Sequence, residues 1–227
     1  MKACATIGDA EKGEEIHTDI ELRGFSVGNS IIGNSLIDMY GKCGSVVLAQ
    51  SVFDHLLSRD VISWTMLIAG YVESGHSEKA LDLFYRMVMV ADAMTFVCTL
   101  KACGNDGTLY KGQEIHIRLV KQGIDNDIFV CNTLVDTYAK CGVLPRAQEV
   151  LEGLPVRDVV SWNALITGYA QQEKGHDALN CFDQMLNEGL SPDVVTFICI
   201  LKVCGSVGAI DRGKQIHEEV VNKGFLQ

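Results

Sequence analysis

The chain has 227 residues, of which 48% are hydrophobic and 7% aromatic, and its formal net charge is −10. This composition excludes a disordered chain, and no stretch reaches the roughly 18–20 uninterrupted apolar residues of a membrane span, so we expect no membrane partner. The negative charge opposes binding to nucleic acid, because neutralisation of phosphates usually supplies most of that affinity, and a binder would need its Lys residues on one face.

The cysteines and the first residues bear on the compartment. Nine cysteines form an odd set without a Cys-x-x-Cys pair. No secretory leader precedes them, so we expect reduced thiols inside a cell or an organelle. The residues after Met1 do not form the Arg- and Ser-rich amphipathic helix of an organelle transit peptide.

The chain repeats itself at distances of 98 to 101 residues. "GNSLIDMYGKCG" (33–44) matches "CNTLVDTYAKCG" (131–142), and "DVISWTMLIAGY" (60–71) matches "DVVSWNALITGY" (158–169). "KACATIGDAEKGEEIH" (2–17) returns at 101–116 and again at 202–217. Self-similarity at a fixed period is the signature of a repeat architecture, so the sequence predicts an array of similar structural units.

In chain order, each block predicts an apolar-periodic helix, a glycine turn, a second helix and a polar loop that usually ends in Asp. The second helices carry a small and a large residue at i and i+4, which place both on one face. These are Ala49/Phe53, Ala80/Phe84, Ala147/Leu151 and Ala178/Phe182. The expected hairpins cover residues 1–29 (partial), 30–60, 61–92, 93–127, 128–158, 159–193 and 194–227 (nearly complete).

A hairpin of two amphipathic helices cannot bury its apolar stripe alone, so neighbouring hairpins must stack. We therefore predict an all-α fold, a right-handed α-solenoid of about six and a half helix-turn-helix repeats whose first helices line one surface. Met1 aligns with Leu100 inside a first helix, and Gln227 comes just before a closing residue. We expect both ends to be cut from a longer array.

The words "SWTMLIAGY", "EKALDLFYRM", "SLIDMYGKCG" and "GQEIHIRLV" resemble the pentatricopeptide repeat family, in its plant-type subclass with P, L and S repeats. The resemblance covers the whole chain, without the E and DYW extensions that follow such arrays. A tetratricopeptide array keeps a regular 34-residue period and would not alternate 31 with 35. The resemblance makes 1–29, 93–127 and 194–227 L repeats, 30–60 and 128–158 S repeats, and 61–92 and 159–193 P repeats.

Members of this subclass bind single-stranded RNA in organelles, one nucleotide per repeat, and most direct C-to-U editing. The resemblance implies that the fifth and last residues of a repeat face the base, that the second residue wedges between bases, and that a Lys faces phosphate. The implied reading pairs are Asn34/Asp60, Thr65/Asp92, Val97/Asp127, Asn132/Asp158 and Asn163/Asp193, with Ile198 lacking its partner. The implied wedges are Ile31, Ile62, Met94, Phe129, Val160 and Val195, and the implied phosphate contacts are Lys42 and Lys140.

The polar side chains at the reading positions can form hydrogen bonds with the edges of bases. An Asn amide offers a donor and an acceptor and meets a uracil edge, whereas the Thr and Asp pair faces the donors of guanine in the family. The side chains of Val97 and Ile198 cannot form hydrogen bonds, so their repeats should discriminate poorly between bases. With the family's parallel orientation, the resemblance predicts 5′-UGnUU-3′ for repeats 30–193.

The resemblance also implies partners and a compartment. We expect single-stranded RNA, an editing deaminase or other editing factors, a monomeric chain, no cofactor and no catalytic site in the chain itself. The compartment would be a mitochondrion or a chloroplast. The alternative is a protein-interaction solenoid, or a degenerate array that does not bind RNA.

Several residues have structural alternatives. His17, His116 and His217 occupy the slot that holds Phe in the other repeats, so we expect packing residues. "HEE" at 217–219 fits the H-x-E of zinc deaminases, but the required P-C-x-x-C does not follow. Cys43 and Cys141 are expected to pack at helix ends, and Trp64 and Trp162 against the adjacent repeat. The reading Asn residues have an alternative as capping residues, and the closing Asp residues as N-caps that serve both purposes.

Overall fold

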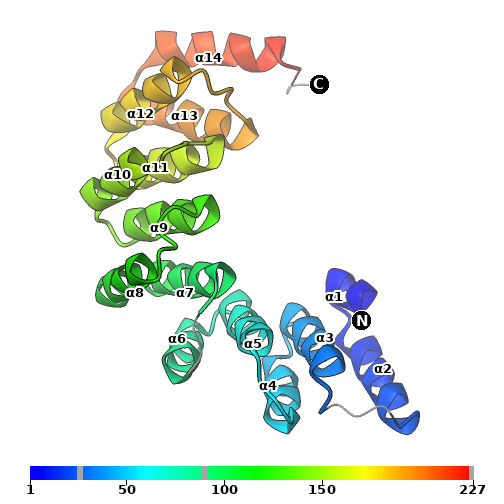
Figure 1. The fold of residues 1–227 in the computed structure, drawn as a ribbon. Coiled ribbons are helices and arrows are strands. Elements are labelled where there is room, and N and C mark those ends of the chain that lie inside the picture. The colour runs from blue at the N-terminus through cyan, green and yellow to red at the C-terminus, as the bar shows by residue number, and fades with distance from the viewer. Residues whose placement is uncertain (25–27, 88–90, 225–227) are drawn as a thin grey trace. The chain divides into compact units, whose positions relative to one another are not determined.

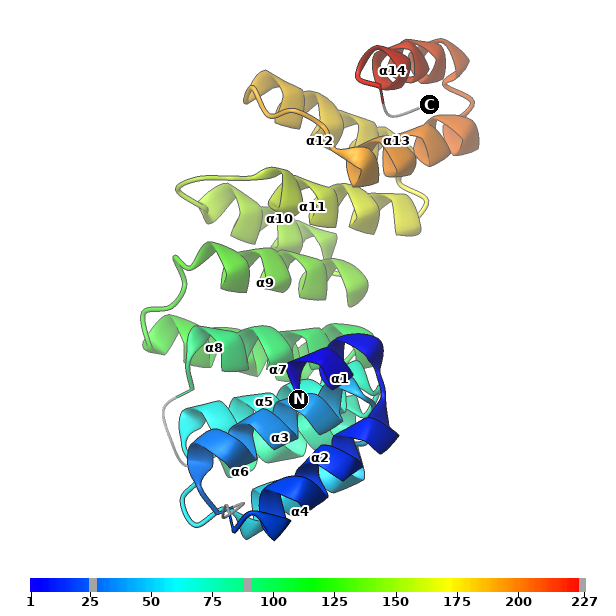
Figure 2. The same cartoon turned by 90° about the vertical axis from the view of Figure 1, so that its right-hand side faces the viewer.

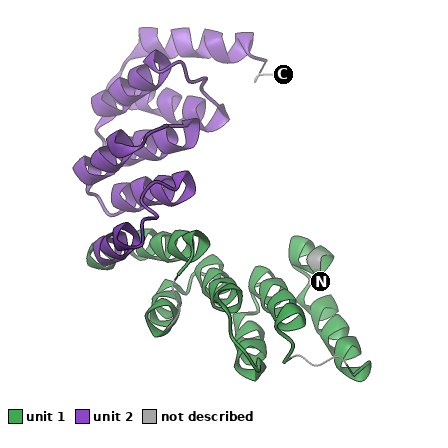
Figure 3. Ribbon diagram, in the orientation of Figure 1, with its two compact units in different colours: residues 1–111 green, residues 112–227 purple. Residues whose placement is uncertain are grey.

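The computed structural model describes residues 1–24, 28–87 and 91–224. Over these ranges the chain forms fourteen α-helices and no β-strand (Figure 1). The chain divides into two compact units, residues 1–111 and 112–227 (Figure 3), and the division falls within α8. The helices are α1 Lys2–Ile7, α2 Ala10–Leu22, α3 Ser30–Lys42, α4 Val46–His55, α5 Val61–Glu73, α6 Ser77–Arg86, α7 Ala93–Asp106, α8 Leu109–Lys121, α9 Ile128–Lys140, α10 Leu144–Gly153, α11 Val159–Gln171, α12 Gly175–Asn187, α13 Val194–Val207 and α14 Ile210–Asn222.

In the first unit the odd-numbered helices form one layer. Helix α3 contacts α1 and α5, and α5 contacts α7. The even-numbered helices pack behind this layer, since α4 contacts both α3 and α5, and α6 contacts both α5 and α7. Each second helix thus fills the groove between its own first helix and the next one, as expected for stacked hairpins.

The second unit repeats this arrangement. Helix α11 contacts α9 and α13 in the layer of first helices (Figure 2). Helix α10 packs against α9 and α11, and α12 against α11 and α13. The predicted fold class, an all-α solenoid of helical hairpins, is confirmed within each unit.

Local sequence explains where the first helices begin. Helices α5, α7, α9, α11 and α13 each start directly after an Asp whose carboxylate accepts a backbone N–H of the first turn. An Asp at this N-cap position satisfies a donor that has no partner inside the helix. The N-cap alternative for the closing aspartates is therefore confirmed, and the caps are Asp60, Asp92, Asp127, Asp158 and Asp193.

The core lies between the two helix layers. The predicted small and large pairs of the second helices are buried, Ala80 and Phe84 completely. The Phe84 ring packs edge-on against Phe96 of the next first helix, with ring centroids 6.0 Å apart. Between first helices, Gly41 of α3 and Gly70 of α5 approach so closely that a Cβ on Gly70 would lie 3.0 Å from the Gly41 Cα.

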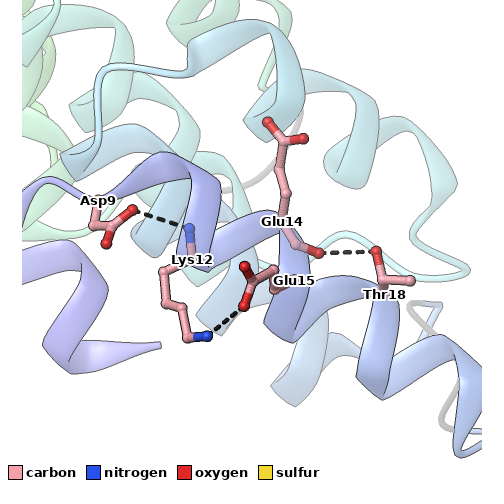
Figure 4. A network of polar contacts seen from close by, with 5 residues as sticks. All are labelled: Asp9, Lys12, Glu14, Glu15 and Thr18. Carbon is pink, nitrogen blue, oxygen red and sulfur yellow. Dashed lines mark hydrogen bonds and ion pairs between the residues drawn. The ribbon is translucent and has the colours of Figure 1, made fainter.

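Helix α2 shows how a second helix presents a polar outer face (Figure 4). The Asp9 carboxylate caps it by accepting the Lys12 N–H at 2.9 Å, and the Lys12 ammonium pairs with Glu15. The Thr18 hydroxyl donates to the Glu14 carbonyl at 2.9 Å. In the part of the chain that the structure describes, no helix has the length and apolar character needed to cross a membrane.

Candidate nucleic-acid interface

The six residues predicted to read at the fifth position of a repeat lie on the first helices, one turn in from the start. Five of the six are nearly buried between neighbouring helices, since Asn34, Thr65, Val97, Asn132 and Asn163 are only 7–9% exposed. Ile198 on α13 is 51% exposed, because no further first helix follows α13 in the described chain. The polar reading groups are therefore recessed.

Three Asn residues each donate from the side-chain amide to the Asp that caps the next first helix. The Asn34 Nδ2 to Asp60 Oδ1 distance is 3.3 Å, the Asn132 to Asp158 distance is 3.1 Å, and the Asn163 to Asp193 distance is 3.0 Å. The structure thus brings together the two members of each pair, which lie 26 or 30 residues apart in sequence. None of these Asn residues caps a helix, so the capping alternative for them is wrong.

The pair of Thr65 and Asp92 is joined through a third residue. The Thr65 and Thr95 hydroxyl oxygens lie 2.6 Å apart, and the Thr95 hydroxyl donates to Asp92 Oδ1 at 2.6 Å. Thr95 is the third residue of α7 and is completely buried. Val97 is also buried in α7 of the first unit, whereas Asp127 caps α9 in the second unit.

Two of the capping carboxylates have a shifted acidity. Burial raises the pKa of Asp60, but hydrogen bonds from the Ser63 N–H and the Asn34 amide outweigh it and hold the pKa below the ordinary 3.8. Burial also raises the pKa of Asp193, and the backbone and hydroxyl of Thr196 with the Asn163 amide reverse that effect. Both groups are therefore anionic at neutral pH, as an acceptor for an amide requires.

The predicted wedge residues stand out from the same surface. Their side chains are 52–77% exposed although all six are large and apolar, and Ile31 and Phe129 are the most exposed. Isolated exposed apolar residues are common on proteins, but here one stands three positions before each recessed reading residue.

The predicted phosphate contacts are engaged within their own helices. Lys42 Nζ lies 2.8 Å from Asp38 on α3, and Lys140 Nζ lies 2.7 Å from Asp136 on α9. Both lysines are exposed at the last residue of a first helix. A phosphate at this position would have to share each ammonium with a carboxylate.

The packing role predicted for His17, His116 and Trp64 is confirmed, whereas the hydrogen-bond partner of Trp162 lies in its own repeat. His17 Nδ1 lies 3.0 Å from the Tyr40 hydroxyl, and His116 Nδ1 lies 2.9 Å from that of Tyr138. The Trp64 ring packs edge-on against Phe53, with ring centroids 4.8 Å apart. Trp162 is buried and donates from Nε1 to Glu188 at 2.9 Å.

Among the described residues, the cysteines and acidic residues form no candidate metal site. Cys43 and Cys141 are the C-cap residues directly after α3 and α9, so they lie at helix ends, as predicted. Within residues 1–24, 28–87 and 91–224, no three His, Cys, Asp or Glu side chains are grouped so as to hold a metal ion. Among the same residues no disulfide forms, and burial raises the pKa of Cys98 and Cys131 to about 11.

Sequence reasoning missed the third residue of the first helices. Ser63, Thr95, Ser161 and Thr196 are completely buried, and each bonds to the Asp that caps its helix. A signal was present, because a hydroxyl residue follows three positions after each of these aspartates, which is the spacing of a capping box.

Family models match three parts of the chain. The model described as the PPR repeat family matches residues 157–206, and the model described as the PPR repeat matches residues 34–61 and 62–89. Curated relatives from Arabidopsis thaliana align along almost the whole chain. A mitochondrial pentatricopeptide repeat-containing protein is 36% identical over 228 residues, which are 99% of this chain and 22% of the relative.

A chloroplastic member is 35% identical over 220 residues, which are 96% of this chain and 36% of the relative. Another, named chloroplastic and mitochondrial, is 36% identical over 228 residues, 97% of this chain and 36% of the relative. The chain thus spans about a fifth to a third of the length of these relatives.

Solved structures share the fold. A crystal structure of the pentatricopeptide repeat protein PPR10 in complex with an 18-nucleotide psaJ RNA element has a TM-score of 0.75 at 18% identity, covering 93% of this chain and 32% of that one. A structure of PPR10 from maize has a TM-score of 0.64 at 18% identity, covering 96% and 37%. The family-model matches, the Arabidopsis relatives and the hairpin architecture show that this chain belongs to the pentatricopeptide repeat family.

Proposed function

We propose that the chain is a sequence-specific module for single-stranded RNA in which each repeat reads one base. The observation that carries the proposal is the recurrence of a recessed polar pair, an Asn amide on a capping carboxylate, behind an exposed apolar side chain. This arrangement appears at Asn34, Asn132 and Asn163. PPR10, which shares the fold, has been crystallised with RNA.

The chemistry of the pair supports a preference for uracil. Once one amide hydrogen is donated to the Asp, the Asn keeps a second hydrogen and lone pairs on its carbonyl oxygen. The edge of uracil offers a matching acceptor and donor. With a Thr at the second position and Val97 at the third, the preferred sequence for repeats 30–193 is 5′-UGnUU-3′.

Stacking would supply most of the affinity. Base stacking on a side chain contributes about 1–3 kcal/mol per base for aromatic residues, and a neutral hydrogen bond about 1 kcal/mol. Phe129 is the one aromatic wedge. We therefore expect weak binding by this chain, with discrimination from the polar pairs and most of the binding energy from the wedges.

Binding of a fluorescent 12-nucleotide RNA that contains UGNUU tests the proposal, measured against a scrambled and a complementary RNA at fixed salt. We expect the UGNUU strand to bind most tightly. Asn163→Ala is the matched variant, because it places an apolar group where Val97 stands in another repeat, and its uracil preference should vanish at one base only. Equal or absent binding of all three RNAs contradicts the proposal.

The biological role follows the family. We propose that the chain specifies organellar transcripts for C-to-U editing or processing, in a mitochondrion or a chloroplast, together with an editing deaminase or other editing factors. The named compartments of the relatives support the organelle. The net charge of −10 is the observation that favours the alternative, a protein-interaction solenoid, and equal binding of all three RNAs would favour it further.

A further inference from the structure

We propose that Thr95 and Thr196, the third residues of α7 and α13, are positioning residues that set how the preceding repeat presents its reading side chain to a base. Ser63 and Ser161 occupy the same position in α5 and α11 but bond only to their own capping Asp, so they serve as the comparison. The inference rests on the proposed function for its consequence, but its structural core can be tested without RNA.

Thr95 fixes the direction of a hydrogen-bond chain. Asp92 is a carboxylate and only accepts, so the single hydroxyl proton of Thr95 goes to Asp92 Oδ1 at 2.6 Å. The Thr65 hydroxyl, 2.6 Å from the Thr95 oxygen, must then donate its own proton to Thr95. Thr65 is left with acceptor lone pairs only.

Because the Thr65 hydroxyl oxygen can then only accept a hydrogen bond, it favours a base with a donor at the facing position. Guanine offers the N1–H and the exocyclic N2–H₂ on its Watson–Crick edge, whereas adenine places the N1 acceptor at the corresponding position. Thr95 therefore gives Thr65 its ability to reject adenine. A threonine whose hydroxyl is free to rotate could instead donate to the adenine N1 or accept from the guanine N1–H, so it would bind both purines.

Thr196 acts on an amide instead of a hydroxyl. Asp193 Oδ1 accepts the Thr196 N–H at 2.8 Å and the Asn163 amide at 3.0 Å, so both of its lone pairs are engaged. The Thr196 hydroxyl has one proton and two acceptors in reach, Asn163 Oδ1 at 2.7 Å and Asp193 Oδ1 at 2.9 Å. Because Asp193 Oδ1 already accepts two N–H groups, we assign the proton to the nearer Asn163 carbonyl oxygen. Asn163 is thus held at both ends of its amide, which fixes the amide plane.

The two serines leave their asparagines held at one end. The Ser63 hydroxyl donates to the backbone carbonyl of Asp60 at 2.8 Å. The Ser161 hydroxyl lies 2.8 Å from the backbone carbonyl of Asp158 and 3.0 Å from Asp158 Oδ1, so it too bonds only to its own capping residue. The carbonyl oxygens of Asn34 and Asn132 are buried and have no hydrogen-bond partner. The chain therefore has two kinds of Asn reader. Asn163 has hydrogen-bond partners at both ends of its amide, whereas Asn34 and Asn132 have a partner at the amide nitrogen only.

The first test measures the reading side chains directly. Exchange between the two side-chain amide protons of Asn163 is followed by NMR in the wild-type chain and in Thr196→Val, which removes the hydroxyl and keeps the shape. We expect the exchange to accelerate and the amide resonances of Asn163 to shift. The matched control is Ser161→Ala, which removes a hydroxyl at the same helix position, and the Asn132 amide should not change.

The second test measures selectivity in the same chain with RNAs that differ at one base. In Thr95→Val, the affinity ratio of guanine over adenine at the Thr65 repeat should fall about fivefold, the effect of one neutral hydrogen bond. Ser63→Ala should leave the uracil preference at the Asn34 repeat intact. Thermal unfolding of each pair identifies any general loss of stability, which would not alter a ratio between two RNAs.

The outcomes separate the two proposals. If the wild-type chain shows no base preference but the Asn163 amide responds to Thr196→Val, the proposed function fails and the positioning of the amide stands. If the wild-type chain prefers guanine and Thr95→Val keeps that preference unchanged, the positioning role is overturned. An Asn163 amide that is insensitive to Thr196→Val overturns it as well.

Discussion

Lys42 and Asp38 form an ion pair across one turn of α3, with Nζ 2.8 Å from Oδ1, and Lys140 and Asp136 repeat it on α9 at 2.7 Å. The only cations predicted to face phosphate are thus partly neutralised by their own helices. Such exposed pairs contribute little to stability, typically a few tenths of a kcal/mol. Their larger effect in this chain would be on charged ligands.

Asp38→Asn combined with Asp136→Asn should therefore strengthen RNA binding. Freeing two ammonium groups for phosphates should steepen the slope of log affinity against log salt by up to about 0.7 for each group on a single strand. Titrations with the 12-nucleotide RNA at several salt concentrations give this slope. Asp82→Asn combined with Asp183→Asn, which frees Arg86 and Arg212 on second helices, is the control with the same change in net charge. An equal gain from the control would mean that the lysines do not face phosphate.

Phe129→Ala should weaken RNA binding without unfolding the chain. The ring is 74% exposed, so its removal costs little burial, whereas loss of a stacked base costs about 1–3 kcal/mol. The dissociation constant should rise about tenfold or more, and the denaturation midpoint should stay within error. Ile117→Ala on α8 removes another exposed apolar side chain and serves as control. Unchanged RNA affinity in Phe129→Ala would remove this residue from the interface.

Thr65→Asn should move the preference of one repeat from guanine towards uracil. Thr95 and Asp92 stand around Thr65 as Thr196 and Asp193 stand around Asn163, so an Asn at 65 is expected to form the same two hydrogen bonds. Competition between RNAs with G or U at the second position measures the change. The reciprocal Asn163→Thr should shift the fifth position towards guanine. A shift at any other position would show that the repeats are misaligned with the bases.

The sequence alone was sufficient to predict structural features that depend on a short stretch of chain. The Asp caps follow from an Asp directly before an apolar-periodic segment, and the place of Trp64 away from the reading face follows from the helical period. The Lys42 and Asp38 pair was also readable, because Asp four residues before Lys is a known helix-stabilising spacing.

Other features depend on the distance between helices and were not predictable in this way. The Thr65 and Thr95 hydroxyls meet because α5 and α7 pack closely, and a hydroxyl at 95 could equally have turned to its own backbone, as Ser63 does. The recessed position of the reading residues has the same origin. Asn34, Thr65, Asn132 and Asn163 lie on helices that pack against the next first helix of the same unit, whereas Ile198, which no described first helix follows, is half exposed.

Stability should fall at acid pH through the capping carboxylates. The pKa values of Asp60 and Asp193 lie below 3.8 in the folded chain, so each stabilises the fold above its unfolded pKa, and this contribution is lost as the pH falls through the folded value. We expect the free energy of unfolding from urea titrations to be flat between about pH 7 and 5 and to decline below about pH 4. Asp193→Asn keeps a capping side chain and should show a shallower decline. An identical decline in the variant would assign the acid sensitivity to other groups.

Gly70→Ala should destabilise the first unit. A Cβ at residue 70 would meet the Gly41 Cα at 3.0 Å, and because that atom belongs to backbone, α3 and α5 would have to move apart. Overpacking of this kind typically costs about 1–3 kcal/mol. Gly205→Ala is the matched control, since Gly205 also lies inside a first helix but a Cβ there has no neighbour within 4 Å. That change should stabilise the chain by about 0.5–1 kcal/mol. Urea denaturation of both variants decides the matter, and equal effects would show that the approach of α3 to α5 is not limited by these glycines.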